Sequence, residues 1–310
     1  MSERFSQEIF SPREYLSRAG FSDQITGIAS GAARVGGRKI LKRYGLSPEE
    51  LHTTLKPEAG MSPVTAADLE SEEAIKRIIH TRLFPDHTIN AEESGELKGK
   101  NNEGESNIVW YVDPLDGTIS FTREQKYSSV GIAVYEKGQP KLATICRPFQ
   151  RETLVAESGK GAWVFPLDDH LDIVGDGKRL SVSANESLKD GIIYIDGVFN
   201  HKTAAPTLKM LERLSNSVGN FGLRSIGTNI GQQAEVAEGR GDLTLTTAVG
   251  GFYDLAAGSL IIEEAGGRFC GLDGQPINSN TQVAIGGNKQ IIEQVLPILQ
   301  KSYEGYQGFK

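Results

Sequence analysis

The sequence predicts a layered protein built from both α-helices and β-strands. Its 310 residues are 38% hydrophobic, which is enough apolar material for a sizeable buried core. In the first half, strand-like runs follow one another with short turns between them, a pattern typical of an antiparallel sheet. In the second half, short apolar strands alternate with helices, which indicates an α/β arrangement.

The N-terminal part is predicted to be mainly helical. Residues 11–44 carry an apolar stripe at helical spacing and are expected to form a helix, whereas the proline-containing residues 45–64 are expected to form a loop. A second helix is expected over residues 66–82, ended by Pro85. Residues 87–91 form the next predicted strand, and residues 95–107 are polar enough to form a solvated loop.

The antiparallel sheet is expected to follow this loop. Its strands are predicted at 108–112, 128–135, 141–146, 153–156 and 162–165. The acidic, turn-rich stretch 166–178 is the predicted boundary between an α+β domain, residues 1–178, and an α/β domain, residues 179–310. In the second domain, strands are predicted at 180–183, 192–195, 243–246 and 282–285, and helices at 203–214, 230–239, 255–265 and 289–300.

Composition excludes several classes of protein. The 33 Lys and Arg against 40 Asp and Glu give a net charge of −7, so no nucleic-acid polymer is expected as a partner. No apolar run approaches the ~20 residues of a membrane-spanning helix, and no membrane partner is expected. The N-terminal residues lack the apolar segment of a secretory signal, so a cytoplasmic location is expected. Because the cysteines, Cys146 and Cys270, and the five histidines are scattered, a zinc site is not expected.

The segment Asp113-Pro114-Leu115-Asp116-Gly117-Thr118 is the most informative motif. An apolar strand ends in Asp113, Pro114 is expected to turn the chain, and Asp116 returns to the same strand end. Two carboxylates that converge repel each other unless a cation lies between them, and Mg²⁺ prefers such oxygen ligands. The amides of Gly117 and Thr118, at the start of an expected helix, suit a phosphate. Taken alone, the motif is explained equally well as a plain Asx-capped turn.

Three further carboxylates occur in distant motifs. Glu92 follows the strand at 87–91, Asp68 lies at the entrance of the helix at 66–82, and Asp254 precedes the most apolar helix. Each has an ordinary structural explanation: a solvated turn for Glu92, and a favourable helix-start charge for Asp68 and Asp254. Four such elements in this order are nevertheless not well explained by helix caps.

This ordered set of motifs resembles the inositol monophosphatase superfamily over about residues 25–300. The motifs that carry the resemblance are Thr65–Asp68, Glu92–Ser94, Asp113–Thr118 and Tyr253–Gly258, supported by Lys178–Ser183 and Glu263–Gly267. The resemblance implies a layered αβαβα sandwich and Mg²⁺-dependent hydrolysis of a phosphate monoester. It also implies lithium sensitivity and a homodimer.

The resemblance further implies two or three Mg²⁺ ions. Carried over by position, their ligands are Glu92, Asp113 and the Leu115 carbonyl for the first ion, Asp113, Asp116 and Asp254 for the second, and Glu92 for a weaker third. The implied substrate contacts are Gly117, Thr118 and Asp254. Asp68 and Thr118, assisted by Glu92, would orient an attacking water, so that no covalent intermediate forms.

The expected substrate is a small phosphorylated polyol or sugar, with inositol monophosphate as the first choice. Three other activities of the superfamily stay open as alternatives: those of a 3′(2′),5′-bisphosphate nucleotidase, a fructose bisphosphatase and a histidinol-phosphate phosphatase. The segment Phe121-Thr122-Arg123 is compatible with the nucleotidase. A haloacid-dehalogenase mechanism needs Asp-x-Asp-Gly-Thr, one residue shorter than the motif here. A catalytically silent member would be expected to lack one of the metal carboxylates, yet all are present.

The sequence departs from the family pattern at three places. Tyr253 stands where the family usually has Trp, and Thr228 and Asn229 replace smaller residues near the substrate, which leaves inositol specificity open. Lys56 lies in a segment that replaces a shorter lysine-containing loop. Lys56, Arg123 and Arg224 are interpreted either as substrate contacts or, more simply, as solvated charges.

Overall fold

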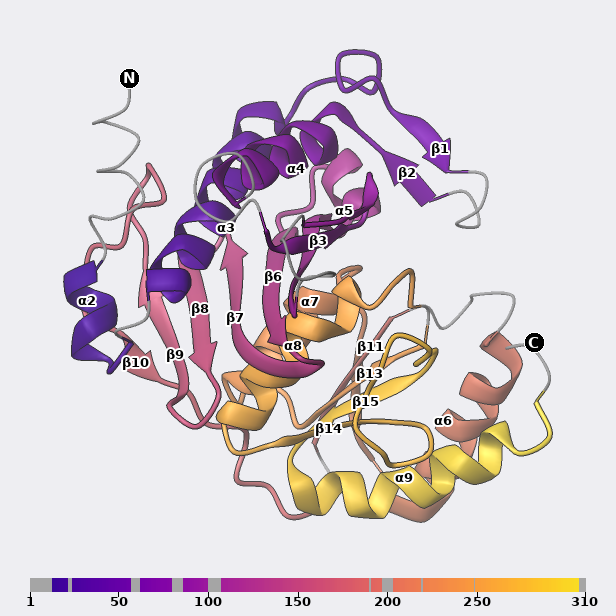
Figure 1. The fold of residues 1–310 in the computed structure, drawn as a ribbon. Helices are drawn as coiled ribbons and strands as arrows, with labels where there is room; N and C mark the ends of the chain where they lie inside the picture. Colours follow the sequence, from indigo (N-terminus) through magenta and orange to yellow (C-terminus); the bar gives the residue numbers. More distant parts are fainter. Residues whose placement is uncertain are drawn as a thin grey trace.

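Helices and sheets alternate in the order αβαβα in the computed structural model (Figure 1). The structure describes residues 13–21, 24–56, 62–79, 86–99, 107–189, 191–196, 203–218, 220–247 and 249–306. The outer helices on one side are α3 (Gln24–Arg43) and α4 (Ala66–Ile79), the central ones α7 (Asn229–Ala237) and α8 (Tyr253–Glu264), and those on the far side α6 (Ala204–Val218) and α9 (Lys289–Tyr303). This arrangement confirms the expected layered sandwich.

The first sheet lies between the α3/α4 layer and the central helices (Figure 1). Its strands are β3 (Thr88–Ala91), β4 (Gly95–Leu97), β5 (Ile108–Asp116), β6 (Ser129–Glu136), β7 (Gln139–Arg147), β8 (Glu152–Glu157), β9 (Gly161–Pro166) and β10 (Lys178–Arg179). They lie in the order β10-β9-β8-β7-β6-β5-β3-β4, and β5 to β9 pair antiparallel, as expected. β3 is parallel to β5, so Glu92, which follows β3, and Asp113 of β5 lie at the same end of these two strands.

The second sheet is mixed and lies between the central helices and the α6/α9 layer (Figure 1). Its strands, in the order β12-β11-β13-β15-β14, are β11 (Ile192–Asp196), β12 (Gly222–Arg224), β13 (Leu243–Thr246), β14 (Arg268–Gly271) and β15 (Ala284–Gly287). β11 is parallel to β12 and β13, while β15 is antiparallel to β13 and β14. Strands and helices alternate here as the sequence predicts. The division of the chain into two domains near residue 178 stays a prediction.

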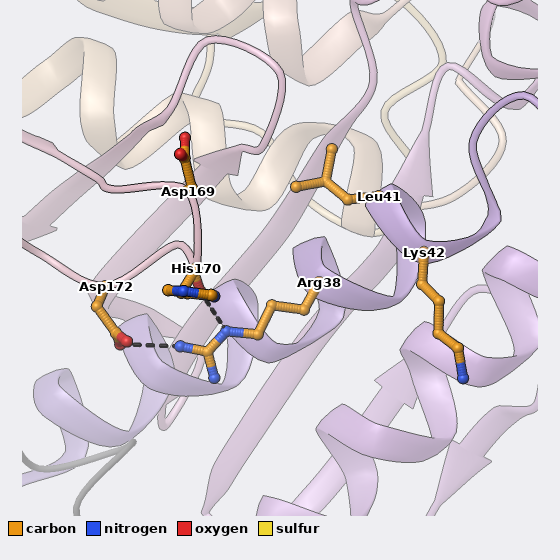
Figure 2. A pocket seen from close by; sticks show the side chains of 6 residues that line it. All are labelled: Arg38, Leu41, Lys42, Asp169, His170 and Asp172. Carbon is orange, nitrogen blue, oxygen red and sulfur yellow. Dashed lines mark hydrogen bonds and ion pairs between the residues drawn. The ribbon is translucent and has the colours of Figure 1, made fainter.

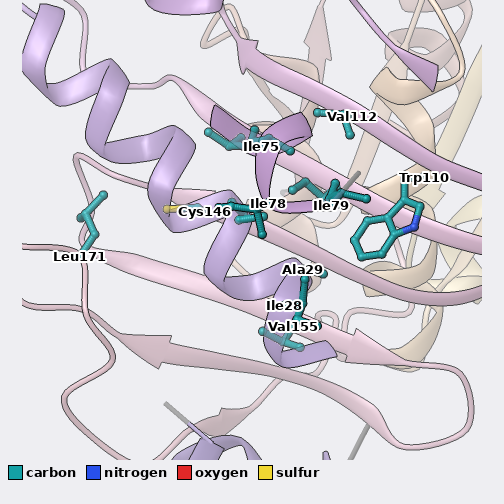
Figure 3. Packing of buried hydrophobic residues seen from close by; sticks show 14 of the residues in the cluster. Ile28, Ala29, Ile75, Ile78, Ile79, Trp110, Val112, Cys146, Val155 and Leu171 are labelled. Atoms are coloured by element: carbon teal, nitrogen blue, oxygen red, sulfur yellow. The ribbon is translucent and has the colours of Figure 1, made fainter. Parts of the chain in front are cut away.

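The core of the first sheet is packed by helix α4 against the strands. Ile75 and Ile78 of α4 lie in one buried cluster with Trp110 and Val112 of β5 and with Cys146 of β7 (Figure 3). The close packing of α3 against α4 depends on Gly36, because a Cβ atom there would lie only 2.7 Å from the Ser71 hydroxyl oxygen. The two helices therefore cover the sheet as one tightly packed layer.

Most of helix α8 is apolar, as expected for a helix that lies between two sheets. Leu255, Ile261 and Ile262 are fully buried between the two sheets. The helix ends as expected at a glycine pair: Gly266 has a φ of 89°, and the Gly267 amide donates to the Ile262 carbonyl over 2.9 Å. No helix in the described part of the chain combines the length and the apolar character that crossing a membrane requires.

Some expectations for the N-terminal part were wrong. Residues 11–44 do not form one helix, because α2 (Arg13–Arg18) is followed by Gly20 in the left-handed region, and α3 begins only at Gln24. The expected loop at 45–64 contains the antiparallel pair β1 (Thr54–Lys56) and β2 (Ser62–Val64). Of the expected loop at 95–107, the first residues form β4, and residues 100–106 lie outside the described part.

Two further differences concern the strands. The strand expected at 180–183 is instead the short β10, Lys178–Arg179, which pairs with β9. Pro114 does not turn the chain back: β5 continues to Asp116 through a bulge, with Asp113 opposite Gly131 and Asp116 opposite Ser129. A bulge tolerates proline because the extra residues have no ladder partner that needs an N–H donor.

Candidate active site

The bulge in β5 brings two carboxylates to one end of the first sheet. Asp113 and Asp116 are exposed by only 2% and 8%. The Leu115 amide donates to Asp113 Oδ1 over 3.1 Å, which fixes that carboxylate inside the bulge. The irregular stretch of β5 therefore points both acidic side chains into the protein. In a regular strand, residues at i and i+3 would point to opposite faces of the sheet.

Asp113 shares its buried environment with other carboxylates. Its carboxyl group lies within hydrogen-bonding range of that of Glu92, and the charges of Asp116 and Asp254 also reach it. Burial, reinforced by these negative neighbours, raises the pKa of Asp113 well above its usual range. Burial and the Glu92 charge raise the pKa of Asp254 in the same way. The structure thus brings together carboxylates from β5, from α8 and from the turn after β3, which are far apart in the sequence.

The first turn of α7 holds Asp116. The Thr228 hydroxyl and the Ile230 amide, the latter over 2.7 Å, donate to Asp116 Oδ2, and the Asn229 amide donates to Oδ1 over 3.1 Å. Thr228 is also the N-cap of α7 and accepts from the Gly231 amide over 3.0 Å. Burial raises the pKa of Asp116 to about 7, even though these hydrogen bonds favour the charged form.

Asp68 and Thr118 form a direct pair. The Thr118 hydroxyl lies 3.0 Å from Asp68 Oδ1 and 3.1 Å from the Leu115 carbonyl oxygen. Asp68 Oδ2 accepts from the Thr65 amide (2.8 Å) and hydroxyl (2.6 Å), a capping box at the start of α4. Burial raises the pKa of Asp68 to about 6. Asp68 therefore acts as a helix cap with one oxygen and faces Thr118 with the other.

Asp254 is more than a helix cap. The N-cap of α8 is Phe252, and Asp254 is the second residue of the helix. Its Oδ2 accepts from the Gly250 amide over 2.6 Å, and its carbonyl oxygen accepts from the Gln233 side chain of α7 over 2.9 Å. Burial and the charges of Glu92 and Asp254 raise the pKa of Tyr253, so this phenol also lies beside the acidic group.

Gly117 links β5 to the short helix α5 (Thr118–Thr122), which confirms the helix expected after the motif. Its φ is 86°, and a Cβ atom there would lie 3.0 Å from the Gly227 carbonyl oxygen and 3.2 Å from Thr228 Cβ. Only glycine suits both the left-handed backbone and this close approach. Gly117 and Thr118 are both partly exposed, so a ligand can reach them.

Lys56 of β1 brings a positive charge to the acidic group. Its Nζ lies 2.9 Å from Glu92 Oε1 and 2.6 Å from Glu93 Oε1. Burial lowers the pKa of Lys56, but the charges and hydrogen bonds of the two glutamates outweigh this effect, so the pKa is raised overall. The interpretation of Lys56 as a solvated charge was therefore wrong. Its side chain is only 21% exposed and contacts a candidate metal ligand.

Sequence reasoning missed Glu93 as a member of this group. A pair of glutamates predicts a solvated edge, yet the Glu93 side chain is only 5% exposed. Burial raises its pKa to about 7. The one signal in the sequence was its position beside Glu92. Arg123 and Arg224 are exposed, and Arg224 donates to the neighbouring Leu223 carbonyl over 3.0 Å.

The chemistry of this acidic group fits a hard divalent cation. Glu92, Asp113, Asp116 and Asp254 are carboxylates whose mutual repulsion a divalent ion would relieve better than the single charge of Lys56. Across the described ranges, however, no three or more Asp, Glu, His or Cys side chains are arranged as metal ligands. Several of these carboxylates face protein donors instead, and binding an ion would require some of them to exchange those donors for it.

A surface pocket of about 510 Å³ lies elsewhere, on the outer side of α3. It is lined by Arg38, Leu41, Lys42, Asp169, His170 and Asp172. Arg38 donates hydrogen bonds to the His170 carbonyl oxygen (2.5 Å) and to Asp172 Oδ1 (2.8 Å), as Figure 2 shows. None of the candidate site residues lines this pocket.

Comparison with known proteins identifies similar chains. The model of the inositol monophosphatase family matches residues 22–304. The Nus factor SuhB of Pasteurella multocida is 33% identical over 282 residues, which are 89% of this chain and 97% of the relative. A Thermotoga maritima protein named fructose-1,6-bisphosphatase/inositol-1-monophosphatase is 30% identical over 249 residues, 79% of this chain and 85% of the relative.

Solved structures agree with this similarity. The extragenic suppressor protein SuhB of Bartonella henselae superimposes with a TM-score of 0.76 at 28% identity, covering 90% of this chain and 99% of the other. The Thermotoga maritima IMPase gives a TM-score of 0.73 at 28% identity, with coverage of 93% and 98%. The layered fold is therefore shared along nearly the whole chain.

Proposed function

Because the chain belongs to the inositol monophosphatase family, we propose that it is a Mg²⁺-dependent phosphomonoesterase. Its proposed substrate is a small phosphorylated polyol or sugar, with inositol monophosphate as the first choice. The observation that carries this proposal is a group of four carboxylates at one end of the first sheet, in which Asp113, Asp116 and Asp254 are buried and Glu92 is half-buried. Such a group is costly for a protein to bury unless cations compensate it.

We propose that Mg²⁺ is held by Glu92, Asp113, Asp116 and Asp254 together with the Leu115 carbonyl oxygen, as two to three ions. Bound there, Mg²⁺ would lower the pKa of a water molecule and neutralise charge on the phosphate and on the leaving oxygen. The chain's own contribution is to gather oxygen ligands and to exclude bulk water from them, since Asp113, Asp116 and Asp254 are all nearly buried. Gly117 and Thr118 are proposed to meet the phosphate.

The Asp68–Thr118 pair is proposed to position the attacking water. Because Asp68 Oδ2 is occupied by Thr65, only Oδ1 is directed at the Thr118 hydroxyl. A threonine that gives its proton to Asp68 offers its oxygen lone pairs to a water, whose proton can then be accepted there. Glu92 is proposed to assist, and Asp254 is proposed to face the substrate as well as a metal ion.

The substrate class is supported by one of the relatives. The Thermotoga maritima relative is named for both fructose-1,6-bisphosphate and inositol-1-phosphate hydrolysis. A 3′(2′),5′-bisphosphate nucleotidase and a histidinol-phosphatase stay as alternatives of the same superfamily. Phosphate release from inositol 1-phosphate, fructose 1,6-bisphosphate, adenosine 3′,5′-bisphosphate and histidinol phosphate, compared by kcat/KM, separates these possibilities.

The activity itself is tested by phosphate release with and without Mg²⁺. We expect turnover that EDTA abolishes, that Mg²⁺ restores, and that Asp113→Asn reduces by about a thousandfold, as for loss of a group central to electrostatic stabilisation. Other relatives of this chain are named Nus factors, so a catalytically silent protein is a real alternative. Absence of turnover on every substrate at saturating Mg²⁺ would establish that alternative.

Three family properties belong to the same proposal. We propose inhibition by Li⁺, a homodimer and a cytoplasmic location. Li⁺ inhibition is measured in the same phosphate assay, and the homodimer by sedimentation equilibrium of the purified chain. If an aspartyl-phosphate on Asp113 were trapped during turnover, the proposed direct attack by water would be wrong.

A further inference from the structure

A buried cluster of charges lies at the C-terminal end of α7, away from the acidic site. Arg147, the last residue of β7, has a side chain that is only 3% exposed. Its guanidinium group contacts Glu235 over 2.6 Å and also contacts Glu152 and Glu238. Arg240 adds contacts to Glu235 (3.1 Å) and Glu238 (3.0 Å).

The cluster connects a helix to a sheet. Arg147 and Glu152 are opposite each other in the β7–β8 ladder, so both belong to the rigid centre of the first sheet. Glu235 lies in the last turn of α7, and Glu238 is its C-cap residue. The buried guanidinium group is therefore the point at which the end of α7 is attached to the sheet.

The helix needs this positive charge. Acidic side chains at the C-terminal end of a helix meet the negative end of its dipole and are unfavourable there. Glu235 and Glu238 occupy that end, and Glu152 brings a third negative charge. Arg147 and Arg240 together supply two positive charges, so removal of the buried one leaves an excess of three glutamates over one arginine.

The opposite end of the same helix holds Asp116. The amides of Asn229 and Ile230 and the hydroxyl of the N-cap Thr228 all donate to that carboxylate. α7 has nine residues and is therefore about 13 Å long, too short to bend appreciably between its ends. A shift at the C-terminal end is thus carried to the donors that orient Asp116.

We propose that Arg147 is a positioning residue for the metal site. By fixing the C-terminal end of α7 to the first sheet, it fixes the first turn of α7 on Asp116, and through Gln233 it also supports the backbone of Asp254. This inference rests on the proposed function, because it takes Asp116 and Asp254 as ligands of Mg²⁺. Groups that orient metal ligands from behind are known to influence metal affinity strongly.

The test is Mg²⁺ binding to the purified, EDTA-treated full chain, measured by isothermal titration calorimetry. We expect Arg147→Met to weaken Mg²⁺ binding by about tenfold. The matched control is Arg34→Met, since Arg34 is another fully buried arginine with an ion pair, to Asp172 over 2.9 Å, but lies in the outer helix α3. The control is expected to lower the melting temperature and to leave Mg²⁺ affinity unchanged.

A second measurement needs no metal. Hydrogen exchange of residues 225–232 in the EDTA-treated protein is expected to speed up in Arg147→Met and not in Arg34→Met, because the amides that face Asp116 lose their fixed position. Should Arg147→Met fail to fold, Arg147→Lys takes its place: it keeps the positive charge of the cluster, but a single ammonium group cannot hold Glu152, Glu235 and Glu238 together as the planar guanidinium group does. Its effect on binding and exchange is expected in the same direction.

The outcomes separate the two proposals. If the wild-type chain binds no Mg²⁺, the proposed function fails and this inference fails with it. If the wild-type chain binds Mg²⁺ but Arg147→Met and Arg147→Lys bind it equally well with unchanged exchange at 225–232, only the positioning role is overturned. Weaker binding in Arg34→Met as well would show a general effect of instability and would also overturn it.

Discussion

The hydroxyl group of Thr118 lies 3.0 Å from Asp68 Oδ1, although 50 residues separate the two in the sequence. Asp68 comes from the first turn of α4, and Thr118 is the first residue of α5. The two helix starts meet beside the carboxylates of β5, because Thr118 also lies 3.1 Å from the Leu115 carbonyl oxygen. The contact therefore joins a helix cap to the acidic site.

The first prediction concerns this pair. We expect Thr118→Ala to reduce kcat by about a hundredfold or more, because the hydroxyl that passes a proton toward Asp68 is lost. Thr118→Ser keeps the hydroxyl and is expected to retain most of the activity. The measurement is phosphate release at saturating Mg²⁺ and substrate. Equal activity of the alanine and serine variants would exclude a role for the hydroxyl group.

The second prediction concerns Lys56, which contacts Glu92 and Glu93. In Lys56→Met, these glutamates lose their positive partner, so the metal-free protein is expected to melt at a lower temperature. Since the lysine no longer competes for Glu92, added Mg²⁺ should raise the melting temperature more in the variant than in the wild type. Differential scanning calorimetry with EDTA and with Mg²⁺ measures both effects. An identical rise in the two proteins would contradict this competition.

The third prediction is the pH dependence of stability without metal. Burial raises the pKa of Asp68 to about 6 and the pKa values of Glu93 and Asp116 to about 7. Between about pH 4 and pH 7 the folded chain thus binds more protons at these groups than the unfolded chain does, and their contribution to stability falls as pH rises. We expect the EDTA-treated protein to melt at a lower temperature at pH 7.5 than at pH 5.5.

Two controls belong to that measurement. Mg²⁺ is expected to remove most of this loss, since the ion stabilises the charged carboxylates. Asp116→Asn is expected to flatten the pH dependence in EDTA, because one of the groups no longer titrates. A metal-free protein whose melting temperature rises steadily from pH 5.5 to 7.5 would contradict the prediction.

The fourth prediction tests the close packing of the outer helices. A Cβ atom at Gly36 would lie 2.7 Å from Ser71 Oγ and 2.9 Å from Ile75 Cδ1, so Gly36→Ala is expected to lower the free energy of unfolding by about 1–3 kcal/mol. Gly27 lies in the same helix, and no atom of the residues that the structure describes lies within 4 Å of a Cβ atom there. Gly27→Ala is therefore expected to stabilise the protein by about 0.5–1 kcal/mol. Urea unfolding of both variants checks the difference in sign.

Local pattern was sufficient for most of the elements. Strand β13 and helices α7 and α8 lie close to their predicted ranges, because their apolar periodicity and flanking glycines act within a few residues. Local pattern failed where a partner strand decides the structure. Among the described residues, β1 and β2 are short and pair only with each other, and β4 forms because β3 lies beside it. Pairing of this kind overrides weak propensity.

The sequence by itself determined the layered fold, the family and the four acidic motifs, since these depend on residue types at short spacing. Only the tertiary structure decided which groups those acids face. Lys56 contacts Glu92 and the buried side chain of Glu93, and the Thr228 hydroxyl donates to Asp116, which lies 112 residues away in the sequence. The physical reason is that burial and electrostatic interaction depend on distance in space, and residues so far apart along the chain leave no periodic trace of their contact.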